Sequence, residues 1–369
     1  MGERKAFKDW FDKAAARVLA GQVAGAMPSF DQEQFIRLAS RNLKALEFAG
    51  RVRQFSDALA ATLPKPIPKA LAVLTESLPP PLPDCEAVTD GWLQWPLGQF
   101  IADHGLEYFD ASMEAMMELT QRFSSEYAIR PFVERYPEAT FDRLLALTDD
   151  PNPHVRRWCS EGTRPRLPWG KKLQGLVADP TPIWPILEAL KDDGELYVRR
   201  SVANNLNDIA KDHAPLVVQR CMAWSEDSNE RRDWAIKHGL RSLIKAGHPG
   251  ALAVIGFGPP KNLAATLNIR PKQVAMGGEI ELLARLETSA DQAQELIVDY
   301  AVHYVRKGDK TSDKVFKWTT LQLPAHGSTA LDKRHSMKAT TVRALYPGVH
   351  QVDLQVNGVR VAEGHFRLT

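Results

Sequence analysis

The sequence NPHVRRW at residues 152–158 returns in altered form as ELYVRRS at residues 195–201, so that the two Arg-Arg pairs are 43 positions apart. A third and weaker copy, SNERRDW, spans residues 228–234. Each copy follows an acidic pair and leads into a predicted helix, and the segments between the copies supply a second helix. Two helices in roughly 33–43 residues are typical of HEAT-like repeats, which bury their core only by stacking on one another.

The rest of the chain divides into helical and extended parts. Residues 5–62 and 97–250 show helical spacing of apolar side chains, and the proline-rich stretches 63–68 and 79–83 are predicted connectors. The N-terminal 60 residues are either a cap of the repeat array or a clamp on a ligand. We therefore predict a mainly α HEAT-like solenoid domain over residues 1–258.

Alternating, β-branched sequence replaces the helical pattern after the GFGPP stretch at residues 256–260. Residues 267–285, 295–306 and 315–323 are predicted strands, and Asn357-Gly358 predicts a hairpin turn between residues 350–356 and 359–361. Short strands with turns over about a hundred residues favour an immunoglobulin-like β-sandwich domain at residues 259–369. A Cys-Trp-Cys core is absent, so the strand topology stays open.

The bulk composition is that of an ordinary soluble protein. The 369 residues are 44% hydrophobic and 25% charged, with a formal net charge of +2, so any basic surface has to be local. The three cysteines are widely spaced and favour reduced thiols rather than a disulfide frame or a zinc site. No secretory signal and no run of apolar residues long enough to cross a membrane is evident, so we expect a cytosolic protein.

Basic residues recur at the repeat spacing. Stacked repeats align equivalent positions, which would turn a nearly neutral sequence into a stripe able to neutralise successive phosphates. The alternative is that each arginine pairs with an acid of the neighbouring repeat or lies on a solvated helix face. The predicted DNA-binding set is Arg156, Arg157, Arg164, Arg166, Trp169, Lys172, Arg199, Arg200, Arg232, Lys237 and Arg241.

Three acids lie among these basic residues. Glu126 is expected to open a helix, Glu161 lies three residues after Trp158 on the same predicted helix, and Asp208 lies towards the end of the corresponding helix. An acid in a basic stripe opposes phosphate binding unless it serves a cationic ligand or transition state. Structural ion pairs are the more common explanation for any single acid.

Trp158 and Trp169 flank the densest group of basic residues, and either core packing or stacking on a base would explain them. The sequence contains no GxGxxG, Walker A, HExxH or GxSxG motif. Chemistry that depends on a nucleotide or a metal is therefore unsupported, and we expect no cofactor and no metal.

Taken together, the helical N-terminal part, the Arg-Arg repeats and the β domain resemble the AlkC branch of the alkylbase DNA glycosylases. The segments 155–169 and 198–208 carry the resemblance most strongly. The related AlkD branch lacks a β domain. The resemblance covers nearly the whole chain, but no single motif in it is diagnostic.

The resemblance implies hydrolytic removal of N3-methylated cationic bases such as 3-methyladenine and 3-methylcytosine. It also implies that a monomer binds the damaged duplex without extruding the nucleotide. A cationic base leaves readily, so carboxylates that stabilise the oxocarbenium-like sugar would suffice. We expect Glu126, Glu161 and Asp208 to line the lesion and Trp158 to pack against its sugar or base.

Two other functions are also compatible with the sequence. A HEAT adaptor could bind a protein or peptide without catalysis, with the β domain as a second docking module. Alternatively, the chain could bind DNA without cleaving anything. Acids within the basic stripe favour the glycosylase, because neither alternative needs them.

Overall fold

The computed structural model describes residues 6–369 apart from residues 228, 309 and 340–343. The chain forms two compact units, one of residues 1–212 with 230–235 and the other of residues 213–229 with 236–369. Ser228, the first residue of the third repeat copy, lies outside the described residues.

The first unit is helical throughout. Its helices are α1 (Lys13–Ala26), α2 (Gln32–Ala39), α3 (Phe48–Thr62), α4 (Ile67–Glu76), α5 (Trp95–His104), α6 (Phe109–Thr120), α7 (Arg130–Arg135), α8 (Pro137–Ala146), α9 (Pro153–Glu161), α10 (Gln174–Ala178), α11 (Trp184–Leu190) and α12 (Leu196–Ile209). Short 3-10 helices lie at Phe7–Trp10, Leu43–Ala45, Ala87–Gln94 and Thr181–Ile183.

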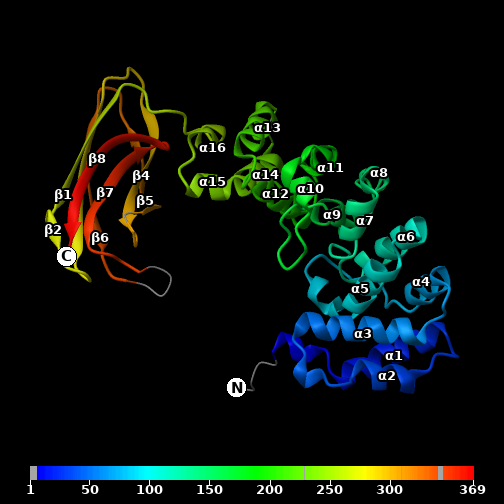
Figure 1. Ribbon diagram of the computed structural model, residues 1–369. Coiled ribbons are helices and arrows are strands. Elements are labelled where there is room, and N and C mark those ends of the chain that lie inside the picture. The colour runs from blue at the N-terminus through cyan, green and yellow to red at the C-terminus, as the bar shows by residue number, and fades with distance from the viewer. Residues whose placement is uncertain (1–5, 228, 309, 340–343) are drawn as a thin grey trace. The chain divides into compact units, whose positions relative to one another are not determined.

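The predicted repeats appear as stacked helix pairs. Helix α8 packs against α11, and α9 packs against α12, so the two copies of the Arg-Arg motif lie on neighbouring, equivalent helices. Figure 1 shows these pairs following one another along the unit. This arrangement is the HEAT-like solenoid that the repeat spacing predicts.

The turns of the first two motif copies are built by the same hydrogen bonds. Asp150 Oδ1 accepts the backbone N–H of Asn152, and Asp193 Oδ1 accepts that of Glu195. Arg156 Nη1 donates to the carbonyls of residues 150 and 151, and Arg199 Nη1 donates to those of residues 193 and 194. The first arginine of each pair therefore closes its own turn, which explains why it recurs.

The prolines delimit helices as expected, with one difference. The connector predicted at residues 63–68 is shorter, because α4 begins at Ile67 and Pro68 lies in its first turn. A proline costs nothing there, since the first backbone N–H groups of a helix have no partner within it. The fold therefore tolerates a proline that the sequence pattern assigned to a connector.

The second unit contains the remaining helices and all strands of the described residues. Helices α13 (Ala214–Glu226), α15 (Arg241–Lys245) and α16 (Pro249–Val254) belong to it, and α14 (Glu230–Gly239) is shared by the two units. The strands are β1 (Leu263–Arg270), β2 (Gln273–Val274), β3 (Glu279–Thr288), β4 (Gln294–Val305), β5 (Thr311–Leu323), β6 (Ser328–Ser336), β7 (Gly348–Val356) and β8 (Val359–Leu368). The stretch 267–285 thus holds parts of three strands.

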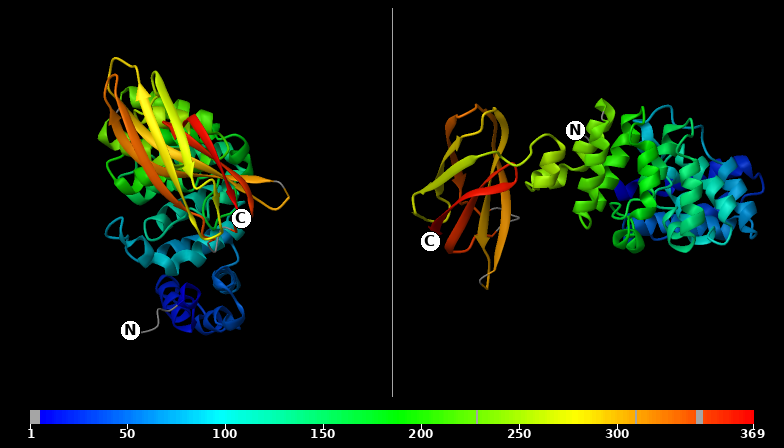
Figure 2. Two further views of the ribbon diagram at one scale, coloured as in Figure 1. Left: turned by 90° about the vertical axis from the view of Figure 1, so that its left-hand side faces the viewer. Right: turned by 90° about the horizontal axis from the view of Figure 1, so that it is seen from above.

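Two sheets form a sandwich, with strand orders β1-β3-β6 and β2-β8-β7-β4-β5 (Figure 2). Alternate side chains of both sheets fill the space between them, among them Leu282 of β3 and Val302 of β4. Asn357 and Gly358 have φ of 48° and 74° and join β7 to β8. Positive φ at both positions is what the Asn-Gly pair predicts for a tight hairpin.

Candidate active site

The three acids singled out in the sequence come from successive segments of the first unit. Glu126 lies in the turn before α7, Glu161 is the last residue of α9, and Asp208 is near the end of α12. The expectation that Glu126 opens a helix is wrong, because α7 begins only at Arg130. All three side chains are buried, with residue exposures of 9%, 5% and 1% in chain order.

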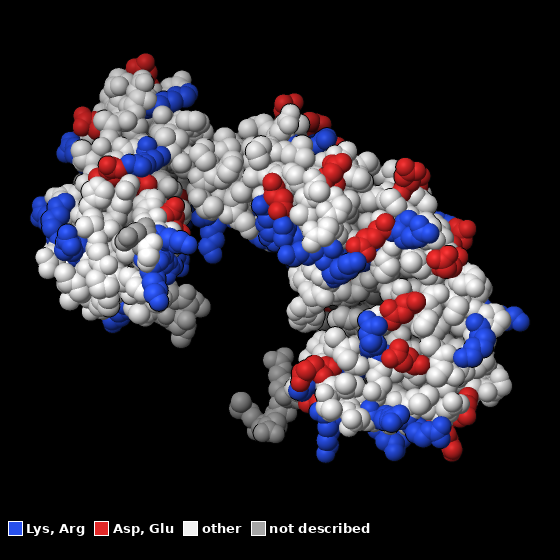
Figure 3. Space-filling view, viewed as in Figure 1, with Lys and Arg blue, Asp and Glu red and all other residues white. Residues whose placement is uncertain are grey.

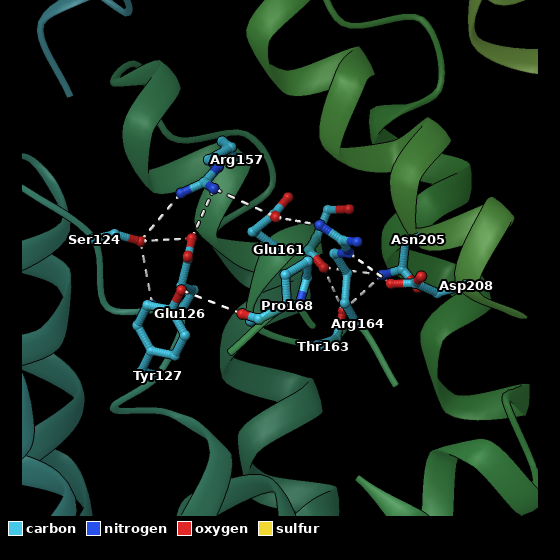
Figure 4. Close-up of polar contacts among 12 residues, drawn as sticks. Ser124, Glu126, Tyr127, Arg157, Glu161, Thr163, Arg164, Pro168, Asn205 and Asp208 are labelled. Carbon is cyan, nitrogen blue, oxygen red and sulfur yellow. Dashed lines mark hydrogen bonds and ion pairs between the residues drawn. The ribbon is translucent and has the colours of Figure 1, made fainter. Parts of the chain in front are cut away.

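Two arginines join the three acids into one line of alternating charge. Arg157 Nη2 lies 2.7 Å from Glu126 Oε2 and 3.4 Å from Glu161 Oε1. Arg164 Nη1 lies 2.6 Å from the same Glu161 oxygen, and its Nε lies 2.8 Å from Asp208 Oδ2. Figure 4 shows the carboxylates and guanidiniums side by side. We call these five residues the carboxylate–guanidinium network.

The network keeps Glu161 and its two arginines charged. Burial would raise the pKa of Glu161, but attraction to Arg157 and Arg164 outweighs it and lowers the pKa. Burial would lower the pKa of both arginines, and their neighbouring carboxylates raise it instead. Three buried carboxylates thus face the buried guanidinium of Arg164 and the half-buried one of Arg157. Lys211 is the next cation, 2.7 Å from Asp208 Oδ1, and its side chain is 48% exposed.

Neighbouring side chains fix the outer end of the network. Ser124 Oγ donates to Glu126 Oε2 at 2.9 Å and accepts from Arg157 Nη1 at 3.1 Å. The Arg157 guanidinium also lies over the Tyr197 ring, 5.3 Å from its centroid. Burial raises the pKa of Tyr197 to about 12, so its hydroxyl stays neutral at physiological pH. Arg157 is therefore held from three sides.

A second buried arginine holds the loop that follows α9. Arg130 Nε donates to the carbonyl of Lys171 at 2.6 Å, and its Nη1 donates to that of Arg164 at 3.0 Å. Asn205 Nδ2 of α12 donates to the carbonyl of Ser160 at 2.9 Å. The segment that carries Glu161 and Arg164 is thus tied to two other elements.

The structure divides the predicted DNA-binding residues into seven arginines whose guanidiniums are engaged within the protein and four residues that are exposed. Arg157 and Arg164 lie inside the network, while Arg156 pairs with Asp193, Arg166 with Asp212 and Arg232 with Asp192. Arg199 and Arg241 donate to backbone carbonyls of residues 193, 194 and 238. This use of their guanidiniums argues against these seven as simple phosphate ligands. Lys172, Arg200, Lys237 and Trp169 are exposed.

The basic surface that remains is local. Figure 3 shows Lys and Arg side chains gathered near α12 on the face in view. Over the N-terminal helices of the same unit, basic and acidic side chains are interspersed. The continuous stripe expected from stacking is therefore reduced by the pairing of its arginines with acids of neighbouring repeats.

Trp158 and Trp169, the two tryptophans that flank the densest group of basic residues, differ completely in their exposure to solvent. Trp158 is fully buried, so its side chain does not reach a surface where a sugar or base could pack. The expected contact between Trp158 and the lesion is not supported, because the α9 face that carries it packs into the core. Trp169 is 80% exposed and has a φ of 63°. Few non-glycine residues adopt this left-handed conformation.

Sequence reasoning missed several residues of the site. Ser124 and Tyr127 flank Glu126 in the chain, and Arg130 lies at the start of α7. Lys211 follows Asp208 by three positions, a spacing that brings helical side chains together and from which the ion pair could have been predicted.

Among the described residues, no three His, Cys, Asp or Glu side chains are grouped to hold a metal. No described helix has both the length and the apolar character needed to span a bilayer.

Comparisons with known proteins cover both units. Residues 263–369 match the family model described as the C-terminal Ig-like domain of the uncharacterised protein YhaZ. The chain is 33% identical over 353 residues to the uncharacterized protein YhaZ of Bacillus subtilis (strain 168), covering 95% of this chain and 96% of that protein. The alkylpurine DNA glycosylase AlkC of Pseudomonas fluorescens, solved bound to DNA containing an abasic site analog, is 34% identical with a TM-score of 0.84. That match covers 99% of each chain.

Proposed function

The chain belongs to the family of the alkylpurine DNA glycosylase AlkC and of YhaZ, and from this premise we propose that it excises N3-methylated, cationic bases from duplex DNA. The substrates that we propose are 3-methyladenine and 3-methylcytosine. The reaction is hydrolysis of the N-glycosidic bond by water, without cleavage of the strand.

The observation that carries this proposal is the carboxylate–guanidinium network. Its three carboxylates are buried and are held in position by Arg157, Arg164 and the half-exposed Lys211. Departure of a cationic base as a neutral leaving group puts positive charge on the sugar. Carboxylates that are already desolvated and held in position stabilise that charge at little cost of reorganisation.

The three acids have different environments, which suggests different roles. Both oxygens of Asp208 are engaged, by Arg164 and by Lys211, and the side chain is almost completely buried. Glu126 is the most exposed of the three, and its contacts with Ser124 and Arg157 both use Oε2. We assign Glu126 to the sugar and the attacking water, and Glu161 and Asp208 to maintenance of the negative field.

We further propose that the damaged nucleotide stays in the duplex during the reaction, as the family resemblance implies. In support, none of the three acids lines the cavity of about 890 Å³ in the first unit. The chemistry that we assign to these three carboxylates therefore lies outside that cavity. Binding of the duplex would rely on the exposed cations, Lys172 and Arg200 among them.

The decisive experiment incubates the protein with methylated duplex DNA and measures released bases over time, without added metal or nucleotide. Release of 3-methyladenine above the spontaneous rate, with intact strands before alkaline treatment, is the expected result. Salt-sensitive binding without release would instead indicate a DNA-binding protein. Absence of both would favour an adaptor function.

A further inference from the structure

Five aromatic rings from distant parts of the first unit line the cavity of about 890 Å³. They are Phe7, Phe48, Trp95, Tyr127 and Trp169. Phe7 stacks on Phe48 with centroids 4.6 Å apart, and Trp95 stacks on Tyr127 with centroids 5.0 Å apart. Phe48 meets Trp95 edge to face at 4.9 Å, so the rings form one continuous aromatic wall.

Trp169 completes this wall at its exposed end. Its ring centroid lies 6.2 Å from that of Phe7. The Tyr127 hydroxyl donates to the carbonyl of Pro168, the residue before Trp169, at 3.4 Å. The loop that presents this exposed indole is held by Arg130, so the indole sits on a fixed support.

Arg130 also lines the cavity and carries an unused donor. The residue is 3% exposed, and its Nη2 has no hydrogen-bond partner among the residues that the structure describes. A buried guanidinium N–H without a partner is costly, so a ligand acceptor that reaches this nitrogen would stabilise it. The preferred ligand is therefore a flat ring that carries a hydrogen-bond acceptor.

The cavity adjoins the proposed reaction site without containing it. Ser124 and Tyr127, which flank Glu126 in the chain, line the cavity, whereas Glu126, Glu161 and Asp208 do not. Ser124 joins the two regions, because it lines the cavity and its Oγ donates to Glu126 Oε2. The cavity is thus a separate space next to the network.

We propose that this aromatic cavity binds one unstacked nucleobase outside the reaction site, an inference that rests on the proposed function. Every nucleobase offers a π face to stack on aromatic side chains and ring or carbonyl acceptors for the Arg130 N–H. Two sources supply such a base, namely a neighbouring or opposite base of the bound strand and the free base after release.

A pocket-filling variant tests the proposal directly. Ala49 lines the cavity, is exposed, and is the second residue of α3, so Ala49→Trp adds a ring without removing a core contact. Ala14, the exposed second residue of α1, lies outside the lining, which makes Ala14→Trp a matched control. Neither substitution touches the network.

The strand source is tested with 5-iodouracil placed opposite or next to an abasic-site analogue, followed by irradiation and mass spectrometry. We expect crosslinks to Trp95 or Tyr127, reduced about tenfold by Ala49→Trp and unchanged by Ala14→Trp. The released-base source is tested by titrating the protein with free 2-aminopurine and following its fluorescence anisotropy. If free 2-aminopurine binds, Ala49→Trp weakens that binding and Ala14→Trp leaves it unchanged, the cavity binds a free base. If no crosslink forms as well, the cavity is assigned to the released base.

Absence of both signals, or signals that Ala49→Trp leaves unchanged, would overturn the proposal. Neither arm requires catalysis, because the DNA already contains the abasic analogue. Failure of the base-release assay would therefore contradict the proposed function without deciding whether the cavity binds a base. Failure of the crosslinking and titration experiments would likewise leave the proposed function untouched.

Discussion

Arg157 Nη2 lies 2.7 Å from Glu126 Oε2, and the same guanidinium nitrogen lies 3.4 Å from Glu161 Oε1. One half-buried cation thus separates two buried carboxylates that would otherwise repel each other. A buried charge that loses its partner is far more costly than an exposed one. The position of Arg157 makes it a positioning residue for both acids rather than a free ligand for phosphate.

Replacement of Arg157 by Met should leave the two acids without their shared partner. We expect base release to fall about 10²-fold and the free energy of unfolding to fall by about 3–5 kcal/mol. Arg157→Lys keeps the charge and should recover part of both losses, although an ammonium lacks the planar fork that reaches Ser124 and Glu126 together. Single-turnover kinetics and urea unfolding measure the two effects. Equal, wild-type rates in both variants would exclude the positioning role.

Glu161→Gln removes the central negative charge of the network but keeps the shape of the side chain. We expect release of 3-methyladenine to fall about 10²–10³-fold, with DNA affinity within about twofold of the wild type, because Glu161 is buried. Affinity is measured by fluorescence anisotropy with abasic-analogue DNA. Wild-type excision by this variant would remove Glu161 from the site.

The pKa of Glu161 gives a prediction for acid stability. Its folded pKa lies below the ordinary value of 4.5, so the stabilisation is present above pH 4.5 and is lost as pH falls through the folded pKa. Glu161→Gln should flatten the fall of the unfolding free energy between about pH 5 and pH 2. The exposed Glu138 serves as control, and Glu138→Gln should keep the wild-type slope. Parallel pH curves for Glu161→Gln and the wild type would contradict the assignment.

Much of the fold was readable from the sequence because the relevant signals are local. The hairpin at Asn357-Gly358 could be predicted because it requires only positive φ at two neighbouring residues. The repeat was readable because the same turn chemistry recurs, as Asp150 with Arg156 and Asp193 with Arg199 illustrate. Each of these features is determined by a few residues in one stretch of chain.

The partners of the charged residues were not readable, because they belong to neighbouring repeats. Arg164 reaches Asp208 and Arg156 reaches Asp193 only once α9 packs on α12. Charge counting therefore suggested a stripe of free arginines where the structure has ion pairs. Grouping of the three acids was predicted, yet the guanidiniums between them were assigned to phosphates instead.

Arg200 and Arg156 provide a test of which arginines meet DNA. Arg200 is exposed, so Arg200→Ala should weaken DNA binding and reduce the slope of log K against log salt by about 0.9. Arg156 already pairs with Asp193 and two carbonyls, so Arg156→Ala should lower stability and leave the slope unchanged. Binding isotherms over a range of salt concentrations decide the point. An unchanged slope for Arg200→Ala would remove it from the phosphate contacts.

Trp158 and Trp169 should respond to truncation in opposite ways. Trp158 is fully buried, so Trp158→Ala should cost about 3–5 kcal/mol of unfolding free energy. Trp169 is 80% exposed, so Trp169→Ala should change stability by no more than about 0.5 kcal/mol while weakening binding to abasic-analogue DNA. Trp169→Phe keeps a ring for stacking and should retain most of the affinity. Urea unfolding and binding measured on the same preparations separate the two effects. If Trp169→Ala binds DNA as the wild type does, its exposed indole has no part in recognition, and the aromatic wall beside it would have to act without its outermost ring.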